Sequence, residues 1–484
     1  MEVIAPNASS SVPELEDLTW GDDVLSLMMV WCGVQIKDLI SQFAMFFYII
    51  SPTASKFETV EEVPDYYIEV STSAMILIIT EMLVCQRSAR LPSYRACDIF
   101  CSLCSSTLYL CISAPTHAMA VYAYEKTYEW RLLEMDWCSN TAWWTAIVAV
   151  DFCFYWFHRF THETNIGWAG HQVHHTSEDF NLGTALRHSA LLKTYSSFFY
   201  LPLALIGFPI TLAFTHLQFN IIFQFWLHTK TVSTVGPLEL IFNTPSHHRV
   251  HHGSEPWCLD KNYAGVLIIW DKIFGTFQPE LKSREIVYGL VDQPQSVNAV
   301  YLEVFYLKKV YEKFSEQTTW ADGLKSIFYG PGWTPGSPRL GHPVPQPPPQ
   351  QPTRKKYDPK LPRSLELYLF FHFVIAAFIQ KNMTIHFLTV SGLEVVVNSV
   401  FLVSTMTVIG GMYDGCKLAM KLEAGRCVLY FLYAASYPAF ENVFVNRTVL
   451  AYLAFSIVLW TAQSLRGNPK NFFLFVKNFK KKRS

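Results

Sequence analysis

The sequence predicts an all-α fold, a polytopic integral membrane bundle of helices with a histidine-rich di-metal site at the cytosolic membrane boundary. Hydrophobic residues make up 51% of the chain and charged residues only 16%, against roughly 25% charged residues in soluble domains. Long apolar runs recur, several of them near the ~20 residues that cross a bilayer core. Most of the 16 histidines fall in closely spaced groups between Asp151 and Gly275. These features indicate a membrane protein with a metal site.

Charge and cysteine usage exclude two other classes of protein. The formal net charge is -1, and the chain has no long basic stripe with interleaved aromatic residues, so nucleic-acid binding is not expected. The 11 cysteines are odd in number and scattered, several of them inside apolar runs, which disfavours a disulfide framework.

The N-terminal part is predicted to begin with a polar tail, residues 1–23, that lacks the basic start and apolar core of a signal peptide. The apolar run 24–50 is interrupted by polar residues, so a span and an interfacial helix both remain open. Residues 66–85 and 99–124 are predicted spans. The short basic loop between these two spans is expected to face the cytoplasm.

The segment 137–160 is a third predicted span, and it ends in the first histidine pair. Two further apolar stretches, 189–214 and 215–228, are broken by Gly207-Phe-Pro209 and are expected to form a helical hairpin. Together, residues 24–328 are predicted to form the membrane-embedded catalytic domain.

The C-terminal part is predicted to follow a Pro- and Gly-rich linker, residues 329–363. Residues 364–466 are expected to supply transmembrane helices, with apolar runs at 365–379, 385–409, 427–440 and 450–462. The linker carries Arg354-Lys-Lys356 and the tail 467–484 is basic, so both are expected in the cytosol. An even number of spans between them satisfies that requirement.

Eight histidines form three boxes with helical spacing. They are His158 and His162; His171, His174 and His175; and His248, His251 and His252. Residues three and four apart share a helix face, so each box is expected to present its imidazoles in one direction. Eight imidazoles exceed the requirement of one ion, which predicts two metals. Imidazole suits zinc, copper, iron and nickel. We prefer iron, because two redox metals in an apolar pocket suit the activation of dioxygen.

Polar stripes flank the boxes on both sides. Asp151 lies on one helical stripe with His158 and His162, and its carboxylate is expected to accept the N–H of a liganding imidazole. His216, Asn220, Gln224 and His228 recur every four residues on an apolar helix. His228 is the predicted ninth ligand. Asn220 and Gln224 are expected to orient ligands or a bound water.

The remaining polar residues near the boxes receive weaker assignments. His216 is expected to be a hydrogen-bonded structural residue, and His188 and His247 are not expected to bind metal. Glu163 follows His162 but lies off its helix face. Its carboxylate is therefore expected to be free to meet a substrate or cofactor group, which makes it the catalytic candidate. A solvated surface charge is the alternative.

The three boxes, in this order within membrane spans, resemble the fatty acid hydroxylase superfamily, which includes sterol desaturases, carotenoid hydroxylases and fatty acid 2-hydroxylases. The segment Trp270-Asp-Lys-Ile-Phe-Gly-Thr276 is similar to the motif that follows the last box in that superfamily. The segments Trp168 to His175, Asn181 to Arg187, Asn243 to Gly253 and Gly330 to Gly341 resemble its ether-lipid monooxygenases, a likeness that extends over about residues 61–341.

The resemblance implies a di-iron enzyme of the endoplasmic reticulum membrane, multi-pass, with its active site facing the cytosol. It implies that tetrahydrobiopterin and O2 are used to cleave the ether bond of an alkylglycerol or related ether lipid, giving a fatty aldehyde and a glycerol derivative. The eight box histidines would be the iron ligands. Glu163 also matches the pattern, whereas no motif assigns a residue to the pterin.

Two other functions remain open from the sequence. The first is a fatty acid or sterol hydroxylase of the same superfamily that takes electrons from a cytochrome or reductase. The second, from another class, is a metal transporter. Transporters place their ligands near the bilayer midplane, whereas these boxes lie at span ends and in connections.

Overall fold

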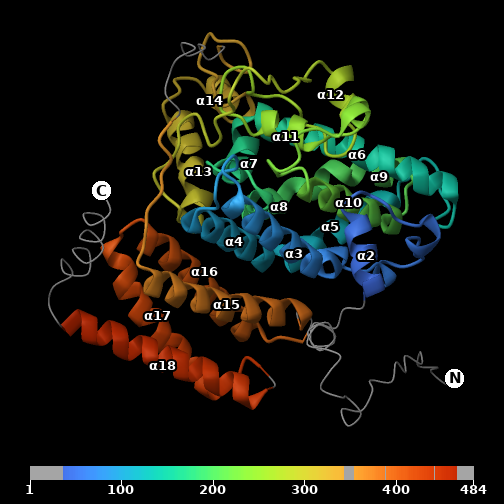
Figure 1. The fold of residues 1–484 in the computed structure, drawn as a ribbon. Helices are drawn as coiled ribbons and strands as arrows, with labels where there is room; N and C mark the ends of the chain where they lie inside the picture. Colours follow the sequence, from blue (N-terminus) through green and yellow to red (C-terminus); the bar gives the residue numbers. More distant parts are fainter. Residues whose placement is uncertain (1–35, 343–353, 387–388, 441, 466–484) are drawn as a thin grey trace, which may run out of the picture.

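The computed structural model describes residues 36–342, 354–386, 389–440 and 442–465, and its regular elements are helices (Figure 1). Within those ranges, extended residues pair only in isolated bridges. The all-α prediction is confirmed. The predicted tails 1–23 and 467–484 and most of the linker's proline run lie outside the described residues. Of the run 24–50, the structure describes a short helix, α2 (Ile36–Met45).

The first long helix, α3 (Tyr66–Arg87), is capped by Asp65, whose side chain accepts a hydrogen bond from the N–H of Ile68. The second predicted span is bent by 48° into α4 (Ala96–Cys111) and α5 (Ser113–Tyr128). Pro115 explains the break, because proline has no N–H to donate and its ring clashes with the carbonyl of residue i−4.

The part that carries the histidine boxes is built on α6 (Asn140–Glu163), α7 (Asn165–His175) and α10 (Ile210–Phe225). Thr164 separates α6 from α7, and its hydroxyl accepts the N–H of Gly167 at 3.2 Å. The expected break before α10 is present at Gly207, where φ is +117° and a Cβ would collide with the Leu133 carbonyl. The helical stretch before this break ends in α9 (Leu201–Ile206).

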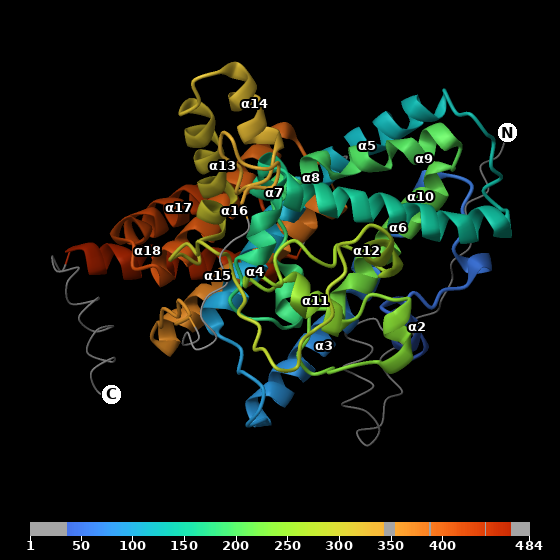
Figure 2. The same cartoon turned by 90° about the horizontal axis from the view of Figure 1, so that it is seen from above.

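Smaller elements surround these three helices. They are the helices α8 (Ala190–Ser196), α11 (Pro245–His251), α12 (Ile269–Ile273), α13 (Ala299–Ser315) and α14 (Trp320–Phe328), and the 3-10 turns η1 (Pro52–Ala54), η2 (Val60–Glu62), η3 (Leu182–Leu186), η4 (Ser197–Tyr200) and η5 (Gly236–Leu240). Seen from above, α7 and α11 lie between α13 on one side and α6 and α10 on the other (Figure 2). Both α13 and α14 pack against α7.

Four C-terminal helices form the lower part of the molecule (Figure 1): α15 (Arg363–Ile385), α16 (Gly392–Tyr413), α17 (Lys417–Ser436) and α18 (Val443–Leu465). They share one hydrophobic core with α4 and α13, in which Leu302, Leu369 and Leu402 are fully buried. The predicted run 385–409 crosses a helix boundary, since α15 continues to Ile385 and α16 begins only at Gly392.

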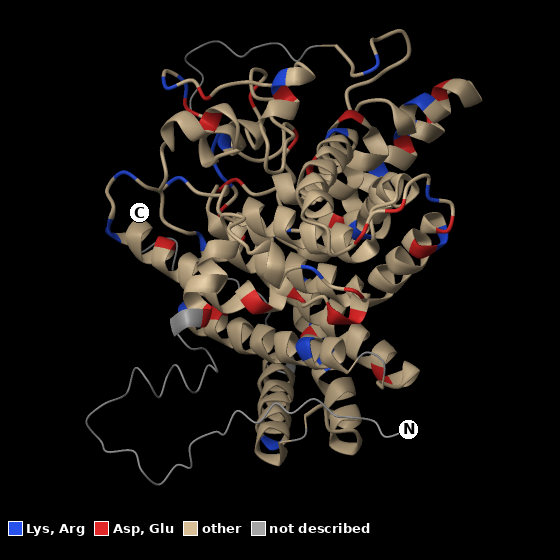
Figure 3. Ribbon diagram, turned by 90° about the vertical axis from the view of Figure 1, so that its right-hand side faces the viewer, with Lys and Arg blue, Asp and Glu red and all other residues tan. Residues whose placement is uncertain are grey.

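Among the described residues, four helices are long and apolar enough to cross a membrane, and the bent α4–α5 pair would be a fifth span. The four are α3 with the turn before it, α15, α16 and α18. Helices α6 and α17 are not among these candidates. Charged residues are sparse along the helices and more frequent in the loops (Figure 3).

The parts of the predicted linker that the structure describes are packed rather than extended. The N–H of Asn165 donates to the carbonyl of Tyr329 at 2.7 Å, and Trp333 is buried. Residues 354–362 connect the upper part of the molecule to α15 in the lower part (Figure 1). The predicted linker therefore contributes contacts to the part of the molecule that carries the histidines.

Candidate metal centre

Nine buried histidines lie in two groups, and these are the nine that the sequence singles out as ligands. Group A consists of His158, His162, His171, His175 and His251, and group B of His174, His228, His248 and His252. Within each group, one ring nitrogen from every histidine lies within 4.8 Å of the others. Four segments supply them: α6, α7, the turn after α10, and α11.

The spacing predicts that each box faces one direction. This holds for His158 and His162, but the second and third boxes are each divided between the two groups. His171 and His175 point into group A, but His174 points into group B. On α11, likewise, His251 belongs to group A and His248 and His252 to group B. Residues i and i+4 stay close in direction, whereas consecutive residues differ by about 100° around the helix. Two neighbouring histidines on one helix therefore serve two sites.

In group B, the Nε2 atoms of His174 and His228 face each other, and each carries a lone pair rather than a proton. The Nδ1 of His174 lies 3.1 Å from the carbonyl oxygen of Arg187, and the Nδ1 of His228 lies 2.9 Å from that of Gln224. A carbonyl only accepts, so each Nδ1 carries the proton and each Nε2 is a lone pair. The two Nε2 atoms are 3.1 Å apart and buried. Such a pair requires a cation between or beside it, which a metal ion would supply.

Group A has the same chemistry. The Nδ1 of His158 donates to the carbonyl of Tyr263 at 2.7 Å, and that of His251 to the carbonyl of Lys261 at 2.9 Å. The Nε2 atoms of His251 and His162 are buried without a hydrogen-bond partner. The Nε2 of His171 lies 2.9 Å from that of His158 and 3.2 Å from that of His175. Two ligands bonded to one metal at 2.0–2.1 Å stand about 3 Å apart.

The imidazoles are held in the neutral form that binds metals. Burial, together with neighbouring imidazoles, lowers the pKa of His174, His175, His248 and His252 well below the usual value. Burial lowers the pKa of His228 to about 3. Neutral histidines keep a lone pair for coordination. The donor set therefore fits imidazole-binding metals, including iron.

Asp151 supports the centre differently from the expected contact with an imidazole. Its fully buried carboxylate accepts the N–H groups of Val266 and Leu267 at 2.8 and 2.9 Å, and the indole N–H of Trp270 at 3.0 Å. The amide of Asn220 donates to it at 2.8 Å. These four donors account for its oxygens, so Asp151 fixes the loop after α11 to α6.

Three residues of the stripe on α10, Asn220, Gln224 and His228, are connected by hydrogen bonds. The Gln224 amide donates to the side-chain oxygen of Asn220 at 2.9 Å, and Asn220 in turn donates to Asp151. Gln224 orients His228 through its main-chain carbonyl. His216 is the structural residue that the sequence predicts, because its Nδ1 lies 3.1 Å from the hydroxyl of Tyr48.

Glu163 is not free to meet a substrate, contrary to the expectation from its position off the helix face. One carboxylate oxygen accepts from Arg159 at 2.8 Å, and the other pairs with Arg339. The residue is buried. Helical spacing could have revealed Arg159, four residues earlier on α6, but not Arg339, which lies 176 positions away. His188 and His247 lie outside both groups, as expected.

Two residues that support the ligands were not identified individually from the sequence. Asp271 accepts the N–H groups of Tyr263 and Ala264, each at 2.8 Å, and so fixes the carbonyl that binds His158. Arg187, fully buried, pairs with Asp98 at 2.9 Å while its carbonyl receives His174. Both stand within segments that carry the family resemblance, but that resemblance gave neither a role.

Comparisons with known proteins agree with this geometry. A family model described as fatty acid hydroxylase matches residues 143–276, the interval that contains all nine histidines. The alkylglycerol monooxygenase of Danio rerio is 38% identical over 428 residues, covering 88% of this chain and 95% of the relative.

Two further relatives carry the same description. The alkylglycerol monooxygenase of Homo sapiens is 38% identical over 393 residues, covering 81% of this chain and 87% of the relative. That of Caenorhabditis elegans is 30% identical over 475 residues, with 93% of each chain covered. No solved structure gives a significant match.

Proposed function

The chain belongs to the alkylglycerol monooxygenases, and from this premise we propose that it oxidises the ether-linked alkyl chain of alkylglycerols, with O2 as oxidant and tetrahydrobiopterin as reductant. The observation that carries the proposal is the arrangement of nine neutral, buried imidazoles in two groups. We assign one iron ion to each group. The lone pairs of His174 and His228, 3.1 Å apart, support the assignment of His228 as the ninth ligand.

The substrate chemistry follows from the ether. The metals, when bound, supply O2 activation with two electrons from the reduced pterin. One oxygen atom is inserted into a C–H bond of the alkyl carbon next to the ether oxygen, and the other leaves as water with two protons. The resulting hemiacetal loses its C–O bond, which gives a fatty aldehyde and a free glycerol hydroxyl. The ether lone pair weakens that C–H bond and so selects the carbon.

The protein's own residues hold this chemistry in place. Main-chain carbonyls of Arg187, Gln224, Tyr263 and Lys261 fix four imidazole rings and their tautomers. Asp151 and Asp271 anchor the loop that presents Tyr263. Near-complete burial of all nine histidines keeps bulk water from the reacting carbon. Orientation of the long alkyl chain is expected to supply much of the rate.

We place the enzyme in the endoplasmic reticulum membrane with the metal groups on the cytosolic side. Apolar helices long enough to cross a membrane support a multi-pass protein. Basic residues near the site, in the loop before α4 and at Arg354 to Lys356, support the cytosolic orientation.

A second candidate is favoured by the family model, which is named for fatty acid hydroxylases. In that case the substrate would be a free fatty acid or a sterol, and electrons would come from a cytochrome or reductase rather than from a pterin. The two candidates share the metal groups and differ in reductant and substrate, so reconstitution distinguishes them.

The test uses full-length protein in lipid nanodiscs, loaded with iron under argon and supplied with an alkylglycerol, O2 and tetrahydrobiopterin. We expect about two iron ions per chain and fatty aldehyde formation that requires the pterin. His174→Ala and His251→Ala, one from each group, should abolish aldehyde formation and lower the bound iron. Pterin-independent turnover with a cytochrome donor would overturn the proposal in favour of the second candidate.

A further inference from the structure

The second histidine box is followed at once by two buried acidic residues. Glu178 and Asp179 come three and four residues after His175, and each side chain is about 5% exposed or less. They follow the C-terminal end of α7, where His175 belongs to group A and His174 to group B. Because buried carboxylates need partners, whatever holds these two also fixes the exit of α7.

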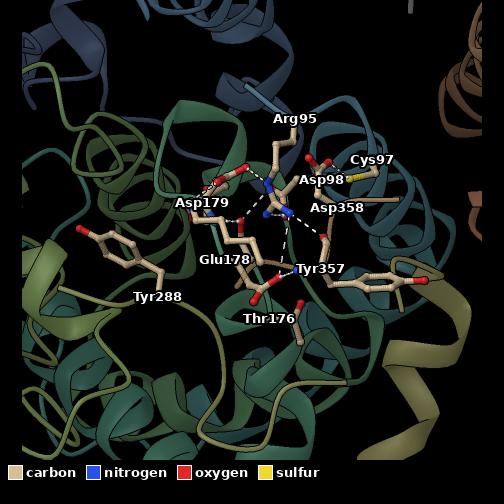
Figure 4. A network of polar contacts seen from close by, with 12 residues as sticks. Arg95, Cys97, Asp98, Thr176, Glu178, Asp179, Tyr288, Tyr357 and Asp358 are labelled. Carbon is tan, nitrogen blue, oxygen red and sulfur yellow. Dashed lines mark hydrogen bonds and ion pairs between the residues drawn. The ribbon is translucent and has the colours of Figure 1, made fainter. Parts of the chain in front are cut away.

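The partners come from a segment on the far side of the proline-rich run, Arg354–Asp358, which we call the strap (Figure 4). The ammonium of Lys356 donates to Asp179 at 2.7 Å, and the N–H of Tyr357 donates to Glu178 at 2.7 Å. Arg354 approaches Glu178 at 3.6 Å. Each carboxylate therefore receives contacts from residues that lie 176 or more positions later in the sequence.

Arg95 joins the strap to the loop before α4. Its guanidinium donates to Asp179 at 2.7 Å and to the carbonyl of Tyr357 at 2.6 Å (Figure 4). It also lies 3.5 Å from Asp98, which accepts the hydroxyl of Ser177 at 2.7 Å. The loop before α4, the exit of α7 and the strap thus form one polar network.

A second route runs from the strap to group B through aromatic rings. The two ends of the Arg354 guanidinium donate to the carbonyls of Leu290 and Tyr288 at 2.6 and 2.9 Å. The ring of Tyr288 stacks on that of Phe180 with centroids 5.0 Å apart. The centroid of the Phe180 ring in turn lies 5.7 Å from that of His228 and 5.2 Å from that of His252.

The chain adjacent to Arg354 is shaped for this contact. Gly289 has a φ of +100°, and a Cβ there would collide with the guanidinium of Arg354. Only glycine combines that backbone conformation with such close approach.

We propose that Arg354 and Lys356 are positioning residues for group B. By neutralising Glu178 and Asp179 and by supporting Tyr288 against Phe180, they hold His174, His228 and His252 at the spacing that one metal ion requires. The segment that leads into α15, the first of the C-terminal helices, would thereby support the metal centre. This inference rests on the proposed function, since it takes the nine histidines to be iron ligands.

The test compares matched double variants of the full-length protein loaded with iron as above. Arg354→Met with Lys356→Met removes two strap cations. Lys355→Met with Lys282→Met removes two cations from exposed side chains, one within the strap and one outside it. Bound iron per chain and the rate of iron release to a ferrous chelator are measured, and neither readout depends on turnover.

We expect the strap variant to keep about one iron ion, or to release one of two at least tenfold faster than wild type. The control should match wild type, and Arg354→Lys with Lys356→Arg should restore iron retention, which general damage to folding would not allow. If the double variant does not accumulate, Lys356→Met alone, at a side chain 39% exposed, must show the accelerated release.

Two results separate the proposals. Wild type with two ions and a strap variant that retains both, with unchanged release, overturns the positioning role and leaves the proposed function intact. Wild type that binds no iron overturns the proposed function, and the positioning role with it.

Discussion

At the scale of single residues, the partner of Nδ1 distinguishes His228, the proposed ninth ligand, from the structural His216 on α10. His216 and His228 belong to the same polar stripe. The Nδ1 of His216 meets a tyrosine hydroxyl, whereas that of His228 donates to a main-chain carbonyl and leaves Nε2 as a lone pair directed at His174. The second arrangement fixes the tautomer for coordination.

Replacing His228 tests this distinction directly. His228→Ala removes one of four imidazoles from group B, so we expect bound iron to fall from about two ions to about one. Aldehyde formation should fall by more than the ~10–100-fold that loss of a residue supporting a ligand costs. His247→Gln is the matched control, since His247 is also buried but lies outside both groups. Iron content by mass spectrometry decides. Full occupancy in His228→Ala would exclude it as a ligand.

At the scale of elements, α11 is too short to be stable on its own. Its seven residues carry two of the grouped histidines, and His252 follows as the C-cap; isolated helices shorter than about 12 residues are marginal in water. Its stability must come from tertiary contacts, and metal coordination by two of its seven residues and by His252 would be the strongest of them.

Metal removal should therefore loosen α11 selectively. In hydrogen–deuterium exchange of the full-length protein, we expect chelation of iron to speed amide exchange in 245–252 by about tenfold or more, because local opening no longer breaks metal bonds. Exchange in α16, which lies in the C-terminal core, serves as the internal control. Equal protection of α11 with and without iron would contradict a metal-stabilised helix.

The C-terminal helices contain a buried ion pair that is independent of the metal groups. Glu423 on α17 accepts two hydrogen bonds from Arg426, at 2.7 and 2.8 Å, and also contacts Tyr368 and His372. All four side chains are buried. Because the buried Glu423 and Arg426 neutralise each other, α17 can hold both charges inside the bundle.

Arg426→Met should destabilise these helices, because it leaves the buried Glu423 carboxylate without its cation. Breaking such a pair costs about 3–5 kcal/mol, seen as a lower thermal midpoint in detergent. Lys421→Met, at an exposed position of the same helix, should change little. Glu423→Gln combined with Arg426→Met should recover much of the loss. If Arg426→Met alone is as stable as wild type, the ion pair does not contribute to stability.

At the scale of the whole molecule, the catalytic helices and the C-terminal helices form one structure. The strap binds the exit of α7, and α4 and α13 share a core with α15 and α16. Helix α6 runs for 24 residues, about 36 Å, from the loop at Cys138 to the metal groups. This length would let the two ends of α6 lie on opposite sides of a membrane, as the proposed orientation requires, although α6 is not among the four apolar candidate spans.

Two native cysteines test the proposed orientation. Cys138 and Cys416 are both exposed, but Cys138 lies just before α6, whereas Cys416 lies beside Asp414, which binds the strap residue Tyr357 at 3.2 Å. In sealed microsomes we expect a membrane-impermeant maleimide to label Cys416 at least tenfold more than Cys138. Permeabilisation should equalise them, as read by peptide mass spectrometry. Preferential labelling of Cys138 in sealed vesicles would reverse the orientation.

The sequence by itself determined the class of the protein and the identity of the clustered histidines. Composition and apolar run length indicate membrane helices, and spacings of three and four place imidazoles on adjacent turns; both are local properties of the chain. The break at Gly207 was predictable for the same reason. The boundary between catalytic and C-terminal domains stays a prediction.

Only the tertiary structure decided how the histidines divide between two groups, which carbonyls fix their tautomers, and what pairs with Asp151 and Glu163. Helical spacing gives a side chain's direction about its own axis, but the direction relative to a neighbouring helix depends on long-range packing. The strap shows this most clearly, because Lys356 reaches Asp179 across 177 positions of sequence. No local pattern carries that contact, since it exists only once α4, α7 and α15 have packed together.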